Sequence, residues 1–317
     1  MKKNNITDLP KSPKIVVTSL SFAKSKFLRQ ELNKKFSNCF FNETGRHLTK
    51  VELIEVLKDA DAAIIGLDKI DESILGKASR LQIISKYGVG LDNIDQGLLA
   101  KYKIRLGWEG GVNRRSVAEV TLCFMLGLCR NIFNSGFSLK QMLWNKNGGA
   151  QITGKTVGII GCGNIGSDVI QLLSPFRCNI LVHDIIDKSE FCQKQKVKET
   201  DLVNLISTSD IISLHVPLTP QTKGMVDKSF ISRMKSTAYL INTSRGDVVD
   251  QAALKNALIN GDIAGAALDV FEEEPPKDKE FLSLPNLMVT PHMAGNSKEA
   301  IMAMGQSAIN HLIDFYK

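Results

Sequence analysis

Residues 156–173 read TVGIIGCGNIGSDVIQLL, and this stretch decides the fold. A short β-rich run leads into the hexapeptide GCGNIG at residues 161–166, and a helical pattern follows. Glycines at this G-x-G-x-x-G spacing carry meaning only between a strand and a helix. Gly161 permits the tight turn, Gly163 lets the backbone approach a pyrophosphate, and Gly166 allows the helix to pack closely on the strand. The stretch therefore predicts a dinucleotide-binding unit, with the pyrophosphate at the helix amino terminus.

An acidic residue stands where such a unit selects its cofactor. The next strand-like run, residues 179–183, ends at Asp184. A carboxylate at this place accepts hydrogen bonds from a ribose 2′-hydroxyl and repels a 2′-phosphate. The expected cofactor is therefore NAD and not NADP, and a simple turn cap is the alternative role for Asp184. We interpret the neighbouring His183 as a strand-end residue and not as a catalyst.

Strand-like and helical patterns alternate along almost the whole chain. Residues 15–20, 62–66 and 81–85 are strand-like, and an amphipathic helix is expected over 21–36. Six more strand-like runs follow within residues 155–292. This alternation predicts an α/β protein with parallel sheets. The second group of strands has the number expected for a doubly wound, Rossmann-type sheet.

Two further helical stretches complete the expected organisation. Residues 116–133 are apolar on nearly every face, which predicts a helix buried on all sides, at a domain junction or a subunit contact. Residues 297–316 have the pattern of one amphipathic helix. We place a dinucleotide-binding domain at 108–293 and the other domain at 1–107, with 294–317 returning to it.

Composition excludes several classes of protein. The 317 residues suffice for about two domains, and 43% hydrophobic with 23% charged residues is typical of a globular chain. A net charge of +7 without a basic stripe gives no reason to expect a nucleic-acid partner. Six cysteines without a C-x-x-C pair predict no metal site and a reducing compartment. Residues 1–13 show no secretory signal and no run is long enough to span a bilayer, so we expect a soluble, cytoplasmic protein without a membrane partner.

Three residue types at predicted strand ends are suited to acid–base chemistry on a small acid. Arg245 follows an apolar run, and a guanidinium holds a carboxylate through two parallel hydrogen bonds. His292 follows LMVTP, and an imidazole moves protons near neutral pH. One of the glutamates at 272–274 is expected to favour the protonated imidazole. Hydride transfer from a 2-hydroxy acid needs such a cation, base and orienting partner. A salt bridge, a structural histidine and a solvated acidic loop are the alternative readings.

Seven segments, in this order, resemble a single family. They are YGVGLDNID (87–95), GVNRRSVAE (111–119), GCGNIG (161–166), HVPLTPQTKGMV (215–226), NTSRGDVVD (242–250), GDIAGAALDVFEEEPP (261–276) and PHMAG (291–295). The chain is similar to the D-isomer-specific 2-hydroxyacid dehydrogenases over nearly its whole length. Within that family it most resembles the D-3-phosphoglycerate dehydrogenases.

The resemblance implies an NAD-dependent oxidoreductase in which Arg245 binds the substrate carboxylate, His292 is the acid/base and Glu274 is the partner of His292. The expected cofactor contacts are Gly161, Gly163, Asn164, Ile165, Gly166, Asp184, Val216, Pro217, Thr243, Ser244, Asp269 and Gly295. The expected substrate contacts are Lys86, Tyr87, Gly88 and Val89, together with Arg245. The resemblance also implies a smaller flavodoxin-like substrate domain, an active site in the cleft between the domains, and a homodimer built around a long helix.

Departures from the family pattern bear on the substrate. Lys86 replaces an arginine that is common in phosphoglycerate-type members, and a lysine holds a phosphate only as a point charge. Residues 108–111, WEGG, replace small polar residues and a proline. The expected substrate is 3-phosphoglycerate, in serine biosynthesis, with glyoxylate or hydroxypyruvate reduction and D-lactate chemistry as alternatives.

Two further expectations concern regulation and the class of protein. Because the chain stops after the closing helix, we expect a short form without a C-terminal regulatory domain and without its feedback site. The alternative from another class is an NAD(H)-sensing binding protein of the same fold, which keeps the same residues and acts by assembly.

Overall fold

The computed structural model describes residues 9–317. Residues 1–8, which make up much of the segment judged to lack a secretory signal, lie outside the described residues. The chain divides into two compact units. Unit 1 contains the residues up to Asn113 together with Lys298–Lys317, and unit 2 is Arg114–Ser297. The sequence places these two boundaries after residues 107 and 293.

Unit 1 contains a sheet of five parallel strands in the order β2-β1-β3-β4-β5. The strands are β1 (Ile15–Val17), β2 (Cys39–Phe41), β3 (Ala62–Ile65), β4 (Ile83–Lys86) and β5 (Arg105–Gly107). This strand order is flavodoxin-like, so the predicted smaller flavodoxin-like sheet is confirmed. Strands β1, β3 and β4 are buried throughout, because helices cover both faces.

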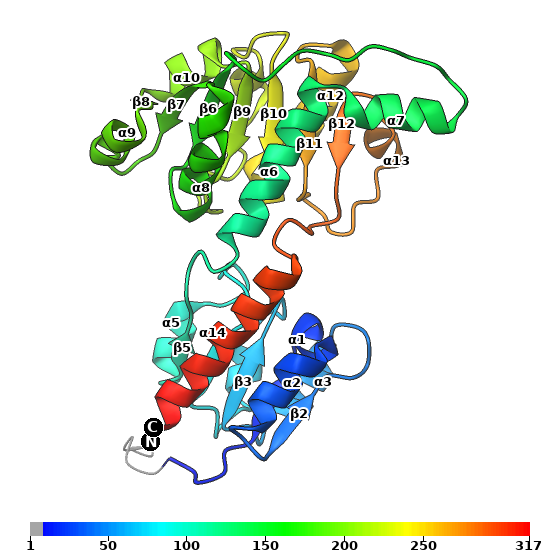
Figure 1. The fold of residues 1–317 in the computed structure, drawn as a ribbon. Coiled ribbons are helices and arrows are strands. Elements are labelled where there is room, and N and C mark those ends of the chain that lie inside the picture. The colour runs from blue at the N-terminus through cyan, green and yellow to red at the C-terminus, as the bar shows by residue number, and fades with distance from the viewer. Residues whose placement is uncertain (1–8) are drawn as a thin grey trace. The chain divides into compact units, whose positions relative to one another are not determined.

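The helices of unit 1 form two layers (Figure 1). They are α1 (Leu20–Lys24), α2 (Lys26–Asn33), α3 (Lys50–Leu57), α4 (Glu72–Leu75), α5 (Gln96–Lys101) and α14 (Lys298–Tyr316). One apolar cluster joins α1, α2 and α14 to the sheet, and the other joins α3, α4 and α5 to it. The helix predicted over 297–316 is confirmed as α14.

The single helix expected over 21–36 is wrong, because the chain forms α1 and α2 with a break at Ser25. Ser25 has extended backbone angles and ends α1. Its hydroxyl also accepts a hydrogen bond from the Leu28 N–H, 3.3 Å away, and so caps α2. Serine is a good cap because its side-chain oxygen satisfies an N–H that the helix leaves free. The amphipathic periodicity continues across the break and therefore hides it.

Unit 2 contains a sheet of seven parallel strands in the order β12-β11-β10-β9-β6-β7-β8. The strands are β6 (Thr156–Ile160), β7 (Asn179–His183), β8 (Lys198–Glu199), β9 (Ile211–Leu214), β10 (Tyr239–Asn242), β11 (Gly265–Leu268) and β12 (Leu287–Val289). The order reverses between β6 and β9, as in the doubly wound Rossmann sheet, so the predicted fold class is confirmed. The six expected strands are present, and the seventh, β8, is a two-residue edge strand too short for a sequence signal.

The helices of unit 2 cover both faces of this sheet. They are α6 (Arg114–Cys129), α7 (Ile132–Lys140), α8 (Asn164–Leu173), α9 (Ser189–Gln195), α10 (Leu202–Thr208), α11 (Lys228–Ile231), α12 (Gln251–Asn260) and α13 (Lys279–Leu282), with 3-10 turns at Ser174–Phe176 and Gly246–Val248. One apolar cluster contains α6, α8 and α9, and the other contains α10 to α13.

The helix expected over 116–133, buried on all sides, is also wrong in two respects. Helix α6 ends at Cys129, and Asn131, with φ of 52°, starts α7 at an angle of 68° to α6. One face of α6 is exposed at Glu119 and Cys123, and α7 has no buried residue. Figure 1 shows α7 running away from the sheet of unit 2, followed by a long connection back to β6.

Within residues 9–317 no single helix is long and apolar enough to cross a bilayer. The bent pair of α6 and α7 meets the length and composition criteria jointly, and half of α6 is buried in unit 2.

Candidate active site

The glycine-rich turn after β6 has the backbone that an anion-binding loop requires. Gly161 has φ of 91°, and a Cβ there would lie 2.6 Å from the His215 carbonyl oxygen. A Cβ on Gly166 would lie 2.1 Å from the Gly161 carbonyl oxygen, so only glycine lets α8 approach β6. A Cβ on Gly163 would meet nothing within 4 Å, and Gly163 caps α8 without a side chain. The N–H groups of Asn164 and Ile165 thus begin α8 beside open space suited to a pyrophosphate.

Asp184 lies at the end of β7 and binds the same turn. Its Oδ2 accepts a hydrogen bond of 2.7 Å from the Cys162 N–H, and its Oδ1 accepts one of 2.9 Å from the Ile186 N–H. The residues after it, Ile185 and Ile186, are 97% and 63% exposed. These two side chains offer no cation to a 2′-phosphate, which agrees with a preference for NAD. His183 Nδ1 donates to the Thr200 carbonyl at 3.2 Å and lies outside the acid–base cluster.

The carboxyl end of β9 lies on the other side of the point where strand order reverses. Val216 is half-buried, and its Cγ1 would lie 3.0 Å from a Cβ on Gly161. Pro217 is exposed, and its carbonyl accepts a hydrogen bond of 2.6 Å from the Thr222 hydroxyl. Ligands bind in open α/β sheets at this reversal point, so the two residues flank the expected cofactor groove.

The turn after β10 positions Arg245 through a buried asparagine. Asn242 Nδ2 donates to the Arg245 carbonyl at 2.8 Å, and Asn242 Oδ1 accepts from the Ser244 N–H at 2.9 Å. The Arg245 guanidinium donates to the Ser244 carbonyl at 2.7 Å. A Cβ on Gly246 would lie 1.9 Å from the backbone of Phe271, so glycine is required where the β10 and β11 turns meet.

Glu274 and His292 form a hydrogen-bonded pair, with 2.6 Å between Oε2 and Nδ1. This hydrogen bond raises the pKa of His292 above its ordinary value, although partial burial acts in the opposite direction. Burial also acts to raise the pKa of Glu274, but the hydrogen bond and charge of His292 outweigh it, so that the pKa is lowered. The charge of Arg245 acts to lower the pKa of both groups, as a nearby cation does.

Only one of the three expected glutamates contacts the histidine. Glu272 accepts a hydrogen bond of 2.9 Å from the Gln251 N–H, and Glu273 pairs with Lys277 on the surface. Glu274 uses its second oxygen to accept a hydrogen bond of 3.1 Å from the Phe271 N–H. The Glu274 carboxylate is therefore fixed in position on both sides.

Asp269 is only 1% exposed and organises the loop that carries His292. Its Oδ1 accepts from the Thr290 hydroxyl at 2.5 Å and from the Met293 N–H at 2.8 Å, and its Oδ2 accepts from the Ala294 N–H at 2.9 Å. His292 itself has φ of 49° in the left-handed region. Gly295 follows Ala294 and is half-buried.

The expected substrate segment lies in unit 1, at the carboxyl end of β4. Gly88 has φ of 111° with open space around it. The Val89 carbonyl accepts a hydrogen bond of 3.0 Å from the Trp108 indole. Tyr87 is buried, its hydroxyl has no hydrogen-bond partner within residues 9–317, and burial raises its pKa to about 12. Glu109 accepts a hydrogen bond of 3.0 Å from Ser307 of α14.

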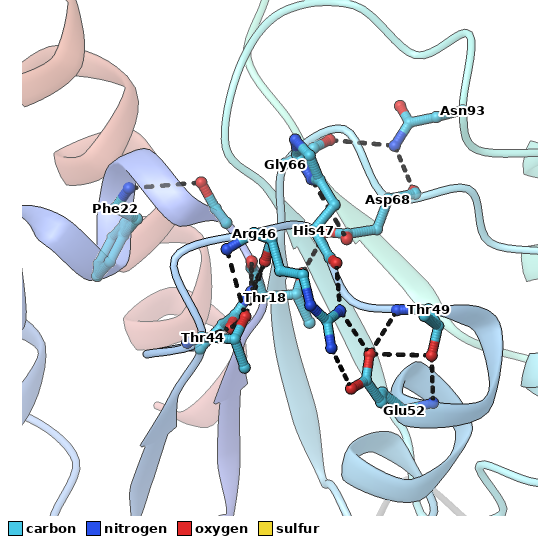
Figure 2. A network of polar contacts seen from close by, with 12 residues as sticks. Thr18, Phe22, Thr44, Arg46, His47, Thr49, Glu52, Gly66, Asp68 and Asn93 are labelled. Carbon is cyan, nitrogen blue, oxygen red and sulfur yellow. Dashed lines mark hydrogen bonds and ion pairs between the residues drawn. The ribbon is translucent and has the colours of Figure 1, made fainter.

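Lys86 is only 4% exposed and connects neighbouring loops. Its ammonium group donates to the Gly66 carbonyl and, at 2.9 Å, to Asn93 Oδ1. Asn93 Nδ2 donates to the carbonyls of Gly66 at 3.0 Å and Asp68 at 2.6 Å, as Figure 2 shows for Asn93. Lys86 therefore helps to hold the loop after β3 against the loop after β4.

A buried carboxylate stands on the loop after β3. Asp68 is 5% exposed, and its Oδ2 accepts a hydrogen bond of 2.6 Å from the Thr18 hydroxyl. The His47 imidazole lies 3.9 Å from its Oδ1, and Figure 2 shows the two side chains near each other. His47, Asp68 and Lys69 all line a hollow of about 400 Å³. The loop that carries Asp68 is also the loop whose Gly66 carbonyl binds Lys86.

Sequence reasoning missed several residues that position this site. Asn242 and Asp68 interrupt or follow apolar strands, and a polar residue at the end of a buried strand was the available signal. Ser116 and Thr121 lie within the apolar run of α6, and only the fold shows what their hydroxyls contact. Within residues 9–317 no group of three or more His, Cys, Asp or Glu side chains is arranged to hold a metal ion.

These features define a class of protein with two α/β units, one of them a dinucleotide-binding domain that carries an Arg and a Glu–His pair at its strand ends. Residues 122–294 match the model of the "D-isomer specific 2-hydroxyacid dehydrogenase, NAD binding domain". The chain belongs to the D-isomer specific 2-hydroxyacid dehydrogenase family, and unit 2 contains its NAD-binding domain.

Named relatives differ in their substrates. The chain is 39% identical over 267 residues to a D-3-phosphoglycerate dehydrogenase of Methanocaldococcus jannaschii, which covers 83% of this chain and 51% of the relative. It is 35% identical to a hydroxypyruvate reductase of Thermotoga maritima, which covers 83% of this chain and 87% of the relative. The chain thus spans about half the length of the phosphoglycerate dehydrogenases that it matches.

A solved structure supports the same fold. The D-lactate dehydrogenase of Aquifex aeolicus, in complex with NAD and lactic acid, superposes with a TM-score of 0.83 and 28% sequence identity. The superposition covers 95% of this chain and 94% of that chain.

The contact between Glu274 and His292 predicts a shift that a titration can measure. In a Glu274→Gln variant the imidazole loses its negative partner, so the pKa of His292 falls toward its ordinary value. Histidine Cε1–H resonances followed by NMR across pH 4–10 measure this shift. Glu273→Gln, whose side chain pairs with Lys277, is the matched control and leaves the pKa of His292 in place. Equal shifts in both variants would show that general surface charge, and not the Glu274 contact, raises the pKa.

Proposed function

We propose that this chain is an NAD-dependent D-2-hydroxyacid dehydrogenase, which interconverts a small 2-hydroxy acid and its 2-keto acid. The observation that carries this proposal is the grouping of Arg245 with the hydrogen-bonded Glu274–His292 pair in an NAD-binding domain. A cation and a proton donor of raised pKa are what reduction of a 2-keto acid requires.

NAD fits the backbone of unit 2. The open space at Gly163 and the N–H groups that begin α8 suit the pyrophosphate, and Asp184 suits the adenosine ribose. We propose that the remaining contacts come from Val216, Pro217 and the turn after β10, with Asp269 and Gly295 near the His292 loop. When bound, NAD exchanges a hydride with C2 of the substrate.

Each residue of the acid–base cluster has one proposed task. Arg245 holds the substrate carboxylate through paired hydrogen bonds, which orients C2. His292 takes the proton of the hydroxyl group in oxidation and returns it to the carbonyl oxygen in reduction. Glu274 accepts the Nδ1–H bond, so that His292 presents its other ring nitrogen to the substrate and stays protonated for reduction. The pair thus favours the protonated imidazole that reduction of a keto acid uses.

We propose that unit 1 binds the substrate through the backbone of Tyr87, Gly88 and Val89 and that the substrate is unphosphorylated, such as hydroxypyruvate or glyoxylate. Lys86 was the expected phosphate ligand, but its ammonium group is buried and bonded to Gly66 and Asn93. A phosphate there would also approach the loop that carries the buried Asp68, because Lys86 is bonded to Gly66 on that loop. A hydroxypyruvate reductase that matches over most of its length supports this choice.

Oxidation of 3-phosphoglycerate is the second candidate, and it would place the enzyme in serine biosynthesis. The 39% identity to a phosphoglycerate dehydrogenase favours it, as does the exposed Lys69 at the rim of the hollow beside Asp68. An NAD(H)-sensing role is a further outcome that the assays below distinguish, and D-lactate chemistry would appear as reduction of pyruvate.

We propose a homodimer in which α7 and the connection after it contact a second copy. This segment exposes Phe137 (59%), Leu143 (58%) and Trp144 (77%), and further apolar side chains lie on the same helix. Contiguous exposed apolar surface of this kind marks interfaces between proteins. We also place the protein in the cytoplasm, because all six cysteines are free and a reducing compartment keeps thiols in that state.

Arg245→Ala tests the proposed reaction. We expect kcat/KM for the keto acid to fall by roughly 100-fold or more, because a positioned charged donor contributes on that scale. The Kd for NADH should change by less than about threefold, since the guanidinium serves the substrate. Arg233→Ala, at an exposed position of unit 2, is the control and changes neither quantity. Equal losses of turnover and NADH affinity contradict the assigned role, and absence of turnover on every acid in wild type favours the sensing protein.

A panel of keto acids tests whether the substrate is phosphorylated. We expect hydroxypyruvate or glyoxylate to be reduced with a kcat/KM at least about tenfold above that of phosphohydroxypyruvate, measured by NADH absorbance at 340 nm. Asp68→Asn removes the buried charge, so it should raise the relative rate with the phosphorylated acid. Asp59→Asn, at an exposed position of unit 1, is the control. If the wild-type protein prefers the phosphorylated acid and Lys69→Met abolishes that preference, the result favours the second candidate, oxidation of 3-phosphoglycerate.

Phe137→Asp tests the dimer. A charge in the apolar α7 surface should shift the protein to monomers in sedimentation-velocity runs at micromolar concentration, because an unpaired charge opposes burial. Phe27→Asp, at an exposed phenylalanine of α2 in unit 1, is the control and leaves the oligomeric state as in wild type. A monomeric wild-type protein contradicts the proposal directly.

A further inference from the structure

Two hydroxyl groups stand on the turn after β10, and the proton of Ser244 is directed into the protein. The Ser244 hydroxyl donates to Asn242 Oδ1 at 2.8 Å. The same Oδ1 accepts the Ser244 N–H, and Asn242 Nδ2 donates to the Arg245 carbonyl, so the amide orientation is determined by three contacts. Asn242 is fully buried. The Ser244 oxygen therefore has only lone pairs left for a ligand.

The available acceptors determine the direction in which the Thr243 hydroxyl donates its proton. The Thr121 oxygen lies 2.9 Å from the Val117 carbonyl and 2.9 Å from the Thr243 oxygen. A carbonyl only accepts, so Thr121 donates its one proton to Val117 and accepts the proton of Thr243. This arrangement satisfies both protons. The reverse arrangement would leave the Thr243 proton without an acceptor within residues 9–317, which is unfavourable for a hydroxyl that is 6% exposed.

We infer that Thr121, a fully buried residue of α6, is a positioning residue that makes Thr243 an acceptor toward the cofactor. The hydroxyl groups of Thr243 and Ser244 then both act only as acceptors, and they take hydrogen bonds from donors on the nicotinamide half of NAD. Those donors are the carboxamide N–H and the ribose hydroxyl groups. The inference rests on the proposed contact between this turn and NAD.

The neighbouring groups have the opposite hydrogen-bonding character. Arg245 presents donors only, and protonated His292 donates from the nitrogen that Glu274 does not hold. The carboxylate and the carbonyl group of a keto acid offer acceptors only. The site thus offers hydrogen-bond acceptors to the cofactor and hydrogen-bond donors to the substrate, so each ligand meets groups of the opposite hydrogen-bonding character.

Thr121→Val tests this inference, because valine keeps the shape of threonine and lacks the hydroxyl. We expect the Kd for NADH, measured by fluorescence without turnover, to rise about fivefold, on the scale of one neutral hydrogen bond. Thr208→Val is the matched control, because the Thr208 hydroxyl also donates to the carbonyl four residues before it, at 2.6 Å, without a second hydroxyl beyond. It should change the Kd by less than twofold. Thr121→Ser retains the hydroxyl and should bind NADH like wild type.

Two further experiments identify the donor group on NADH and test whether Thr121 acts through Thr243. With the reduced 3-acetylpyridine analogue, which lacks the amide N–H, the Thr121→Val penalty vanishes if the carboxamide is the donor and persists if a ribose hydroxyl is. In a Thr243→Val background, Thr121→Val should add no further loss. A penalty of equal size in that background, or equal effects of Thr121→Val and Thr208→Val, overturns the inference. Failure of the proposed reaction appears instead in the Arg245 assay, which depends on turnover.

Discussion

The hydrogen bonds of Asp269 are the contacts on which the acid–base cluster depends. A carboxylate that is 1% exposed is costly unless donors surround it, and here one hydroxyl and two backbone N–H groups do so. All three donors lie within residues 290–294, and the Asp269 carbonyl also accepts the His292 N–H at 2.8 Å. The loop is held on both sides of His292, which keeps this non-glycine residue in a left-handed conformation. The geometry of the Glu274 contact follows from that constraint.

Helix α6 supports both functional turns of unit 2 through hydroxyl groups. The Ser116 hydroxyl donates to the Ala294 carbonyl at 2.5 Å and accepts the Ser297 N–H at 3.2 Å, while Thr121 contacts Thr243. Polar groups inside an apolar helix are tolerated because each has a partner. The exposed face of α6 continues toward α7, the proposed subunit contact. One helix therefore connects the turn after β10, the His292 loop and the surface proposed to meet a second copy.

Much of this organisation can be predicted from the sequence, and the features that could not be predicted have physical causes. The G-x-G-x-x-G turn and the strand ends were predictable because only glycine fits at Gly161 and Gly166, and because buried parallel strands form apolar runs. The break at Ser25 was not predictable, since a helix-capping serine leaves the hydrophobic periodicity of the sequence unchanged. The bend at Asn131 was not predictable either, because an apolar run has the same composition whether it packs inside one chain or faces another. Which glutamate contacts His292 depends on the path of the loop, which spacing alone does not determine.

The position of Lys86 shows why a substrate cannot be assigned from a count of cations. In the sequence, a lysine next to the glycine-containing segment at residues 87–90 resembles a phosphate ligand. In the fold it is the last residue of a central strand, and β3 and β5 flank that strand on either side. Its ammonium group is therefore surrounded by protein acceptors, and Gly66 and Asn93 satisfy it. Releasing it toward a phosphate would leave those buried acceptors unpaired, a cost that a surface lysine does not carry. Location in the sheet, more than residue type, thus decides whether this cation holds a ligand or holds the loops of unit 1 together.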